Sequence, residues 1–468
     1  MLPRYLNGLA ALAAGLMACQ GSSGPGAGAL PPASQAVPST SLLRLPRAGG
    51  APKLYAGPSL EVLGWRARAR TPAVQMVVGF DLDQGLAYAV DSTGGLEALD
   101  VTTGTSRVLA PGVQGVVLGP EGTLWVVDDQ EGVVRIRHRF AERIAATLPS
   151  RPIALYGTGD RQLLAIEPGD TARAVLVAGA QPGITADLPT AVTAASPWGD
   201  LLAVAAPTGV YLWAPRGAAP MRRVRMGGTP RAVRFSASGH RIYVGREAEN
   251  LGVIERYGGE RLDDIAIPGA AAGLRVAPYG GWLLARPAEG DTLWIVNLAT
   301  GRYAGAVIAP WGPDLPTVLG DATLLIRRGR DVVALDLGQV GFPETGRLKG
   351  AAGDLYLPMP WLPAADRPEP VVAQADTSRA GVPADSAEAL TAPPETGAAM
   401  YLQVSRSQNP AWAQALAEEI RGEGYPALVL DPGPGEEAYR VVVGPYPSRE
   451  AAESAGRQLG RPSFIYQP

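Results

Sequence analysis

The sequence of 468 residues contains a single cysteine, Cys19. A lone cysteine cannot form an internal disulfide, so a small fold held together by disulfides is excluded. Histidine is almost as rare, with His138 and His240 as the two instances. This leaves no readable Ser-His-Asp triad, cysteine nucleophile pair or histidine-based zinc cluster. We therefore expect no cofactor, no metal and no enzymatic activity.

Charge is also scarce, since charged residues make up 18% of the chain and the formal net charge is -3. Phosphate binding needs a concentrated basic surface, so we expect no nucleic acid partner. The longest early apolar stretch, residues 6–17, is shorter than the roughly 20 residues that cross a bilayer. Apolar residues nevertheless reach 46% of the chain, which is enough for a sizeable core.

The N-terminal segment has the pattern of an export signal, with a basic opening and a short apolar centre over residues 1–18. Its ending, Leu16 to Cys19, resembles the bacterial lipobox, which implies lipidation of Cys19 and attachment to a lipid bilayer. Gln20 stands where an aspartate would favour retention in the inner membrane. We therefore expect the periplasmic side of the outer membrane. An ordinary signal peptide that happens to contain a cysteine remains the alternative.

Residues 19–52 are rich in Gly, Ser, Pro and Ala, which predicts a flexible tether that carries Cys19. Residues 364–399 are rich in Pro, Ala and acidic side chains and poor in aromatics, which predicts a disordered linker.

Residues 53–363 repeat a pattern of short apolar strands and Ser/Gly turns at intervals of about 40 residues, which is typical of β-propeller blades. The clearest unit is 231–244, and a third strand with a second turn follows in units such as 95–104 and 292–301. Glycine at the end of these turns supplies the positive φ of a tight hairpin. Aspartates at the turns are expected to accept local hydrogen bonds, and tryptophans in the strands to pack between blades.

We count seven such units, and their first strands begin near Val77, Val113, Ile153, Val192, Ala232, Leu274 and Val318. Strands near 54–65 and 355–361 would share a closing blade, so eight blades stay open as an alternative. The units resemble quinoprotein-like and YVTN-type propellers in general form. That likeness implies a fold and names no ligand, so the propeller's protein partner is unknown.

Residues 400–468 change pattern and predict the order β-α-β-β-α-β. An Asn-Pro pair at 409–410 starts the first helix, Gly422 and Gly424 end it, and Ser448 caps the second helix. Together with an all-β propeller, this makes a multidomain chain that ends in a small α+β domain.

This last domain resembles the SPOR domain. The resemblance rests on the first strand from Tyr401 to Val404, the helix 412–424 and the run Tyr-Arg-Val-Val-Val-Gly-Pro-Tyr at 439–446. It implies an antiparallel sheet backed by two helices that binds peptidoglycan glycan strands lacking their stem peptides.

Strand alternation predicts that Leu402 and Val404 face the helices, so that alternate side chains face the glycan. The resemblance implies an outward apolar position on the last strand, which Ile465 matches. After the first strand the sequence departs from the family's pattern, so either glycan affinity is lower or Arg406 compensates. The predicted glycan-binding residues are Tyr401, Gln403, Ser405, Arg406, Arg440 and Ile465.

The sequence therefore predicts an outer-membrane lipoprotein that binds denuded glycan strands and presents a propeller to protein partners, in cell envelope organisation or cell division. Two alternatives remain open. One is a propeller enzyme that acts on a cell-wall sugar or an exported metabolite. The other is a scaffold for outer-membrane assembly, in which the last domain serves only for localisation.

Overall fold

A computed structural model of the chain describes residues 40–360 and 400–466, with gaps at 69, 83, 120–121, 129–131, 138–139, 159–161, 179–180, 198, 218–219, 279, 408–409, 433–438 and 460–462. The predicted signal, Cys19 and the predicted linker 364–399 lie outside the described residues. Within the described part, no helix has both the length and the apolar character to cross a bilayer.

Residues 74–348 form seven four-stranded antiparallel sheets, in which consecutive strands are neighbours. Each of the predicted repeat units corresponds to one of these sheets. Their strands are β3 (Val74–Asp81), β4 (Leu86–Asp91), β5 (Leu96–Asp100) and β6 (Thr105–Ala110); β7 (Gly115–Leu118), β8 (Leu124–Val127), β9 (Gly132–Arg137) and β10 (Phe140–Thr147); β11 (Ala154–Gly157), β12 (Leu163–Glu167), β13 (Ala172–Ala178) and β14 (Gln181–Leu188); β15 (Thr193–Ala195), β16 (Leu202–Ala206), β17 (Gly209–Trp213) and β18 (Arg222–Val224); β19 (Pro230–Phe235), β20 (Arg241–Arg246), β21 (Asn250–Glu255) and β22 (Arg261–Ala266); β23 (Gly273–Val276), β24 (Trp282–Arg286), β25 (Thr292–Asn297) and β26 (Arg302–Ile308); and β27 (Thr317–Val318), β28 (Thr323–Arg328), β29 (Asp331–Asp336) and β30 (Glu344–Leu348).

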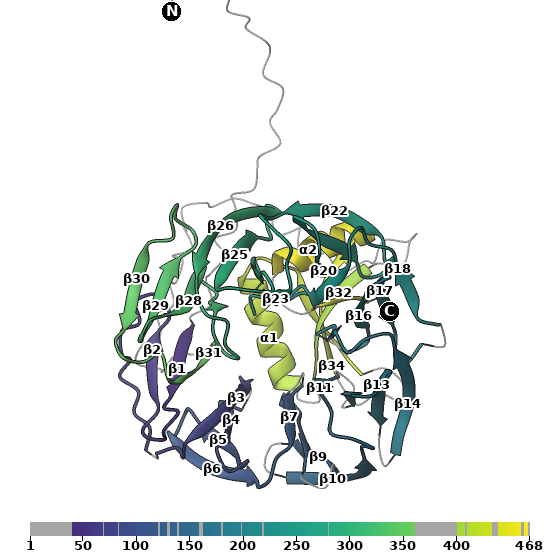
Figure 1. Cartoon of the computed structure of the whole chain (residues 1–468). Helices are drawn as coiled ribbons and strands as arrows, with labels where there is room; N and C mark the ends of the chain where they lie inside the picture. The colour runs from purple at the N-terminus through teal and green to yellow at the C-terminus, as the bar shows by residue number, and fades with distance from the viewer. Residues whose placement is uncertain are drawn as a thin grey trace, which may run out of the picture. The chain divides into compact units, whose positions relative to one another are not determined.

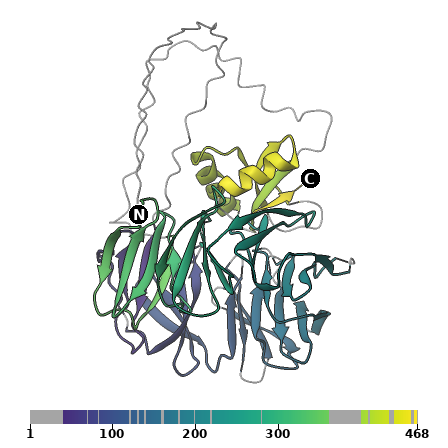
Figure 2. The same ribbon diagram turned by 45° about the horizontal axis from the view of Figure 1, so that its top comes forward.

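These sheets form the blades of a β-propeller. Figure 1 shows the first strands, such as β3, β7 and β23, near the centre of the ring and the fourth strands, such as β6 and β14, at its rim. Figure 2 shows the same ring tilted, with the strands of each sheet running between its two faces.

A three-stranded sheet closes the ring from both ends of the repeat region, in the order β2-β1-β31. Its strands are β1 (Ser41–Leu45), β2 (Lys53–Ala56) and β31 (Leu355–Met359). In Figure 1, purple β1 and β2 lie beside green β31. This is the shared closing blade of the eight-blade alternative. The described residues therefore contain eight sheets in the ring, one more than the seven units counted in the sequence.

The position of β1 corrects the predicted boundary at residue 53, because this strand lies inside the segment predicted as a flexible tether. Its residues Leu42, Leu43 and Leu45 are each at most 2% exposed. A strand buried on both faces reads as a continuous apolar run, not as an alternation. The run Ser41–Leu45 therefore lacks the alternation that would distinguish a strand from the surrounding glycine- and proline-rich segment.

Alternating residues of the closing sheet pack against the two ends of the repeat region. Leu42 and Tyr356 belong to a cluster with the β27–β30 sheet, whereas Leu43 and Leu357 belong to a cluster with the β3–β6 sheet. Six further apolar clusters join the six remaining pairs of consecutive sheets, with one cluster for each pair. Eight interfaces therefore close the ring, and each sheet packs against a neighbour on both of its faces.

Polar contacts reinforce this closure. The Arg44 Nε donates to Asp354 Oδ2 at 2.6 Å, and the backbone N–H of Arg47 donates to Asp354 Oδ1 at 3.1 Å. This pairing joins residues 310 positions apart along the chain. The pairing of β1 with β31 is thus stabilised both by apolar packing and by contacts between charged groups.

The predicted roles of turn aspartates and strand tryptophans are confirmed. Asp91 Oδ1 accepts from the backbone N–H groups of Thr93 (2.7 Å) and Gly95 (2.8 Å). Burial opposes ionisation of Asp91, but these hydrogen bonds outweigh it and lower its pKa. Trp125 and Trp294 are buried within clusters between sheets.

The last domain forms a separate four-stranded antiparallel sheet in the order β33-β34-β32-β35, with two helices. Its elements follow the predicted order: β32 (Met400–Ser407), α1 (Pro410–Gly422), β33 (Ala427–Leu430), β34 (Tyr439–Tyr446), α2 (Arg449–Leu459) and β35 (Phe464–Tyr466). The second helix begins where Ser448 Oγ accepts from the N–H of Ala451 at 3.2 Å, which is the predicted cap.

The closing sheet predicts how many N-terminal residues can be deleted before the propeller fails to fold. A chain that begins at residue 53 lacks β1 and exposes the apolar faces of two sheets, so it should fail to form a cooperative propeller. Each buried leucine lost contributes roughly 1.5–3 kcal/mol, against a typical total stability of about 5–15 kcal/mol. A chain that begins at residue 38 should unfold like the full chain. Thermal unfolding followed by circular dichroism compares them, and equal midpoints would contradict the assignment of β1.

Candidate functional site

The sheet of the last domain has one face covered by its own helices. Its core contains Ala413, Ala417 and Ile420 of α1 with Ala452 and Leu459 of α2, packed on Leu402, Val441 and Val443. The alanines at positions 413 and 417 let the helix backbone approach the strands closely. This packing defines the opposite, helix-free face, which contains Tyr401, Gln403, Leu428, Leu430, Arg440, Val442 and Tyr466 by cross-strand register.

A β-bulge in β32 decides which residues share that face. Gln403 pairs with Val442, but Ser405 pairs with Val441, so two residues of β32 oppose one residue of β34. Ser405 therefore lies on the helix-covered side with Val441, and its predicted place on the glycan-facing side is wrong. The register then places position 406 opposite Arg440.

The last strand also differs from its predicted orientation. Ile465 pairs with Leu402 and packs against the helix-covered core, so its prediction as an outward residue is wrong. Tyr466, which the sequence analysis missed, pairs with Tyr401 on the helix-free face. The residues Phe-Ile-Tyr at 464–466 alternate along the strand, so the sequence shows that positions 465 and 466 lie on opposite faces. The pairing register with β32 was needed to decide which of them lies on the helix-covered face.

Arg440 is the centre of the helix-free face. Its Nη1 donates to Gln403 Oε1 at 2.7 Å, and its guanidinium carbon lies 5.0 Å from the ring centroid of Tyr466. A hydrogen bond and a cation–π contact thus hold the guanidinium from two sides. The half-buried Arg440 is oriented before any ligand arrives.

Gln403 lies on the helix-free face, where strand alternation predicted it. Its side chain is 2% exposed, and its oxygen accepts the hydrogen bond from Arg440. We interpret Gln403 as the residue that orients Arg440. The aromatic surface of this face comes from Tyr401 and Tyr466, which are both half-buried.

The turn after β34 shapes the edge of the site. Gly444 has φ +136°, and a Cβ there would lie 3.0 Å from the carbonyl oxygen of Met400 and 3.2 Å from the rings of Tyr401 and Tyr446. A side chain at this position would push these neighbours away by a few tenths of an ångström, and the positive φ would be strained for any other residue. The backbone conformation and the close approach of the rings therefore both favour glycine in the run 439–446.

Comparison with known proteins identifies this domain. The SPOR domain family model matches residues 396–466. Residues 396–466 are therefore a SPOR domain, which supports peptidoglycan binding in the periplasm. No curated protein matches the chain.

Several solved structures are similar to the propeller. AztD of Citrobacter koseri has 11% identity and a TM-score of 0.49, over 69% of this chain and 98% of that one. The dihydro-heme d1 dehydrogenase NirN in complex with DHE has 14% identity and a TM-score of 0.47, over 69% and 78%. Kluyveromyces lactis Hsv2 has 12% identity and a TM-score of 0.43, over 59% and 99%. These likenesses are too weak to assign a ligand to the propeller.

The two faces of β35 predict losses of stability of different size for neighbouring substitutions. Ile465→Ala removes core packing and should destabilise the domain by roughly 1–3 kcal/mol. Tyr466→Ala removes a cation–π contact and should cost about 0.5–1 kcal/mol. Hydrogen exchange of peptides from residues 400–466, measured by mass spectrometry in the full chain, reports both. Greater loss of protection in Tyr466→Ala than in Ile465→Ala would reverse the assignment of faces.

Proposed function

We propose that this chain is an outer-membrane lipoprotein that binds denuded glycan strands through its SPOR domain and presents its propeller to protein partners. Its role would lie in cell envelope organisation or cell division, by binding and not by catalysis. The observation that carries the proposal is the guanidinium of Arg440, fixed between Gln403 and Tyr466 on the helix-free face.

The chemistry of a denuded strand supports this assignment. Removal of the stem peptide leaves each muramic acid with a lactyl carboxylate, whereas an intact strand has an amide at that position. A planar guanidinium suits a carboxylate, because it donates two parallel N–H groups to the two oxygens. Arg440 therefore provides a physical reason to prefer denuded strands over intact ones.

The tyrosines on the same face support sugar binding. Tyr401 and Tyr466 are register partners on neighbouring strands. Aromatic rings offer apolar faces to the C–H surfaces of sugar rings while their hydroxyls stay hydrated. A glycan strand lying across β32 and β35 would contact these rings and place a carboxylate at Arg440.

Membrane attachment is proposed from the sequence alone. Two or more acyl chains on Cys19 would anchor the protein firmly, since a single chain gives only marginal binding. The linker of 36 residues at 364–399 would let the SPOR domain reach glycan at a distance, about 30–35 Å as a flexible coil.

Sedimentation with purified sacculi tests the glycan site. Arg440→Ala should weaken binding to amidase-treated sacculi by roughly tenfold to a hundredfold, because a charge-assisted hydrogen bond contributes about 1.5–3 kcal/mol. Deletion of 400–468 should abolish binding. Arg421→Ala, which removes an exposed arginine from α1, is the matched control and should bind normally.

Two results would contradict the proposed site. One is equal binding of the wild-type chain to intact and amidase-treated sacculi. The other is retention of full affinity by Arg440→Ala while the deletion loses it, which would move the glycan site elsewhere on the domain.

Fractionation of cells tests the anchor. Cys19→Ser should move the protein from the membrane fraction to the soluble periplasmic fraction, because the thiol is the site of lipid attachment. Ser23→Ala, in the same segment, should leave the protein in the membrane fraction. A variant that combines Cys19→Ser with deletion of 400–468 also lacks attachment through peptidoglycan. If this variant stayed in the membrane fraction, lipidation would be excluded as the anchor.

A further inference from the structure

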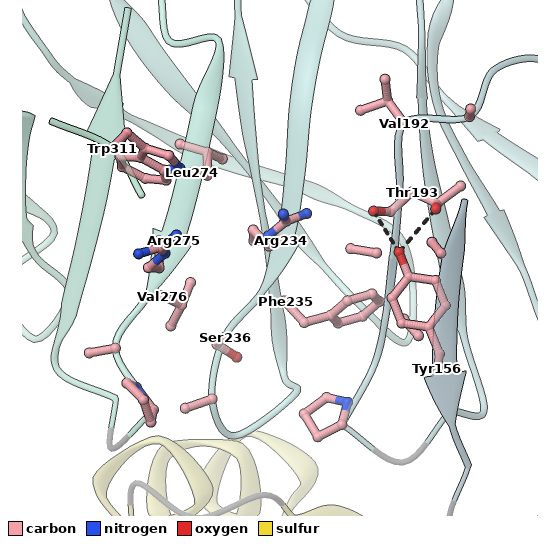
Figure 3. Close-up of a pocket in the computed structure, with 18 residues that line it drawn as sticks. Tyr156, Val192, Thr193, Arg234, Phe235, Ser236, Leu274, Arg275, Val276 and Trp311 are labelled. Atoms are coloured by element: carbon pink, nitrogen blue, oxygen red, sulfur yellow. Dashed lines mark hydrogen bonds between the residues drawn. The ribbon is translucent and has the colours of Figure 1, made fainter. Parts of the chain in front are cut away.

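The propeller contains a cavity of about 720 Å³ along the first strands of four consecutive sheets. Its walls come from β11, β15, β19 and β23 and from Trp311, which precedes β27. This volume lies within the range of small-molecule sites, about 300–1,000 Å³. Figure 3 shows the side chains that line it.

The charged side chains that line the cavity are all cationic. Arg234 on β19 and Arg275 on β23 line it, and no carboxylate is among its lining residues, all of which the structure describes. Figure 3 shows the two guanidinium groups on neighbouring strands. Arg234 is exposed to solvent in the cavity, and its Nη1 donates to the backbone oxygen of Val233 at 2.9 Å.

Arg275 is held rigidly. It donates from Nη1 to the carbonyl of Pro316 at 2.6 Å and from Nη2 to the carbonyl of Gly312 at 2.8 Å. Its guanidinium carbon lies 4.6 Å from the ring centroid of Trp311. Burial, followed by the neighbouring arginines, lowers the pKa of Arg275 to about 10, while Asp314 opposes the shift. The group therefore stays cationic at neutral pH.

A third arginine extends this positive region. The guanidinium carbon of Arg286 lies 5.3 Å from the Trp311 ring, and its buried Nε has no hydrogen-bond partner. Gly273 makes room for it, since a Cβ there would lie 2.7 Å from that Nε. Arg286 does not line the cavity itself, but its charge and that of Arg234 repel the charge of Arg275, so an anion bound in the cavity would relieve this repulsion.

Apolar and aromatic side chains line the rest of the cavity. Tyr156, Val192 and Phe235 line it together with Leu274 and Val276. The Tyr156 hydroxyl is already hydrogen-bonded to Thr193, 3.0 Å from both its carbonyl oxygen and its Oγ1. These side chains therefore offer a ligand apolar contact area and few hydrogen-bonding groups.

We propose that this cavity binds a small molecule that bears an oxyanion, a carboxylate or a phosphate, on an apolar or aromatic body. The oxyanion would lie against Arg234 and Arg275, and the apolar body against Tyr156 and Phe235. This site belongs to the propeller and is independent of glycan binding by the SPOR domain.

Matched probes test the charge requirement. 1-Naphthoate and 1-naphthyl phosphate carry the two oxyanions on one aromatic body, and 1-naphthalenemethanol is their neutral counterpart. Isothermal titration of the full chain should show binding of at least one anion about tenfold or more tighter than the alcohol. Comparison of the two anions then identifies the oxyanion. Equal affinity of all three, or no binding by either anion, would overturn the proposal.

Variants of the exposed arginine locate the site. Arg234→Gln should weaken the preferred anion about tenfold, and Arg234→Lys should retain most of the affinity because it keeps the charge. Arg302→Gln, which removes an exposed arginine from the outer strand β26, is the matched control and should bind normally. Thermal unfolding verifies that each variant is folded. Unchanged affinity in folded Arg234→Gln would overturn the proposal.

Discussion

The propeller depends on the pairing of β1 with β31, which joins the start of the repeat region to its end. Every blade buries its two faces only if it has a neighbour on each side, so an open ring would leave two apolar faces in water. Leu42 and Leu43, adjacent in β1, face the last and the first sheets respectively. The entropy of closing so long a loop grows only slowly with its length, and burial of both faces offsets it.

In the SPOR domain, one β-bulge decides which residues lie on the helix-free face. The bulge keeps Val404 and Ser405 on the same side of β32 and returns position 406 to the face of Arg440. Without it, strict alternation would place Ser405 there. Arg440 is then held by Gln403 and Tyr466, so part of the conformational entropy that binding would cost is already lost in folding.

Both proposed sites use arginine beside an aromatic ring. Arg440 lies against Tyr466, and Arg275 lies against Trp311. The ring fixes the plane of the guanidinium and excludes water from one side, which strengthens its interaction with an anion. In a chain with few charged residues, such cations stand out against a mostly neutral background. The two sites are nevertheless separate in chemistry, because one lies on a sheet face suited to a long strand and the other in a cavity suited to a small molecule.

The sequence by itself determined the repeat architecture and the order of elements in the SPOR domain, because strand alternation, turn glycines and helix caps are local properties. Each predicted repeat unit became one sheet, and Ser448 caps its helix as expected. Only the tertiary structure decided that β1 closes the ring, since its partner lies about 310 residues away. It also decided the face of Ser405 through a β-bulge, and the faces of Ile465 and Tyr466 through the pairing of β35 with β32, and no local pattern predicts either. The cavity that Arg234 and Arg275 line also depends on the tertiary structure, because the two arginines come from different blades and only the packing of those blades brings them together.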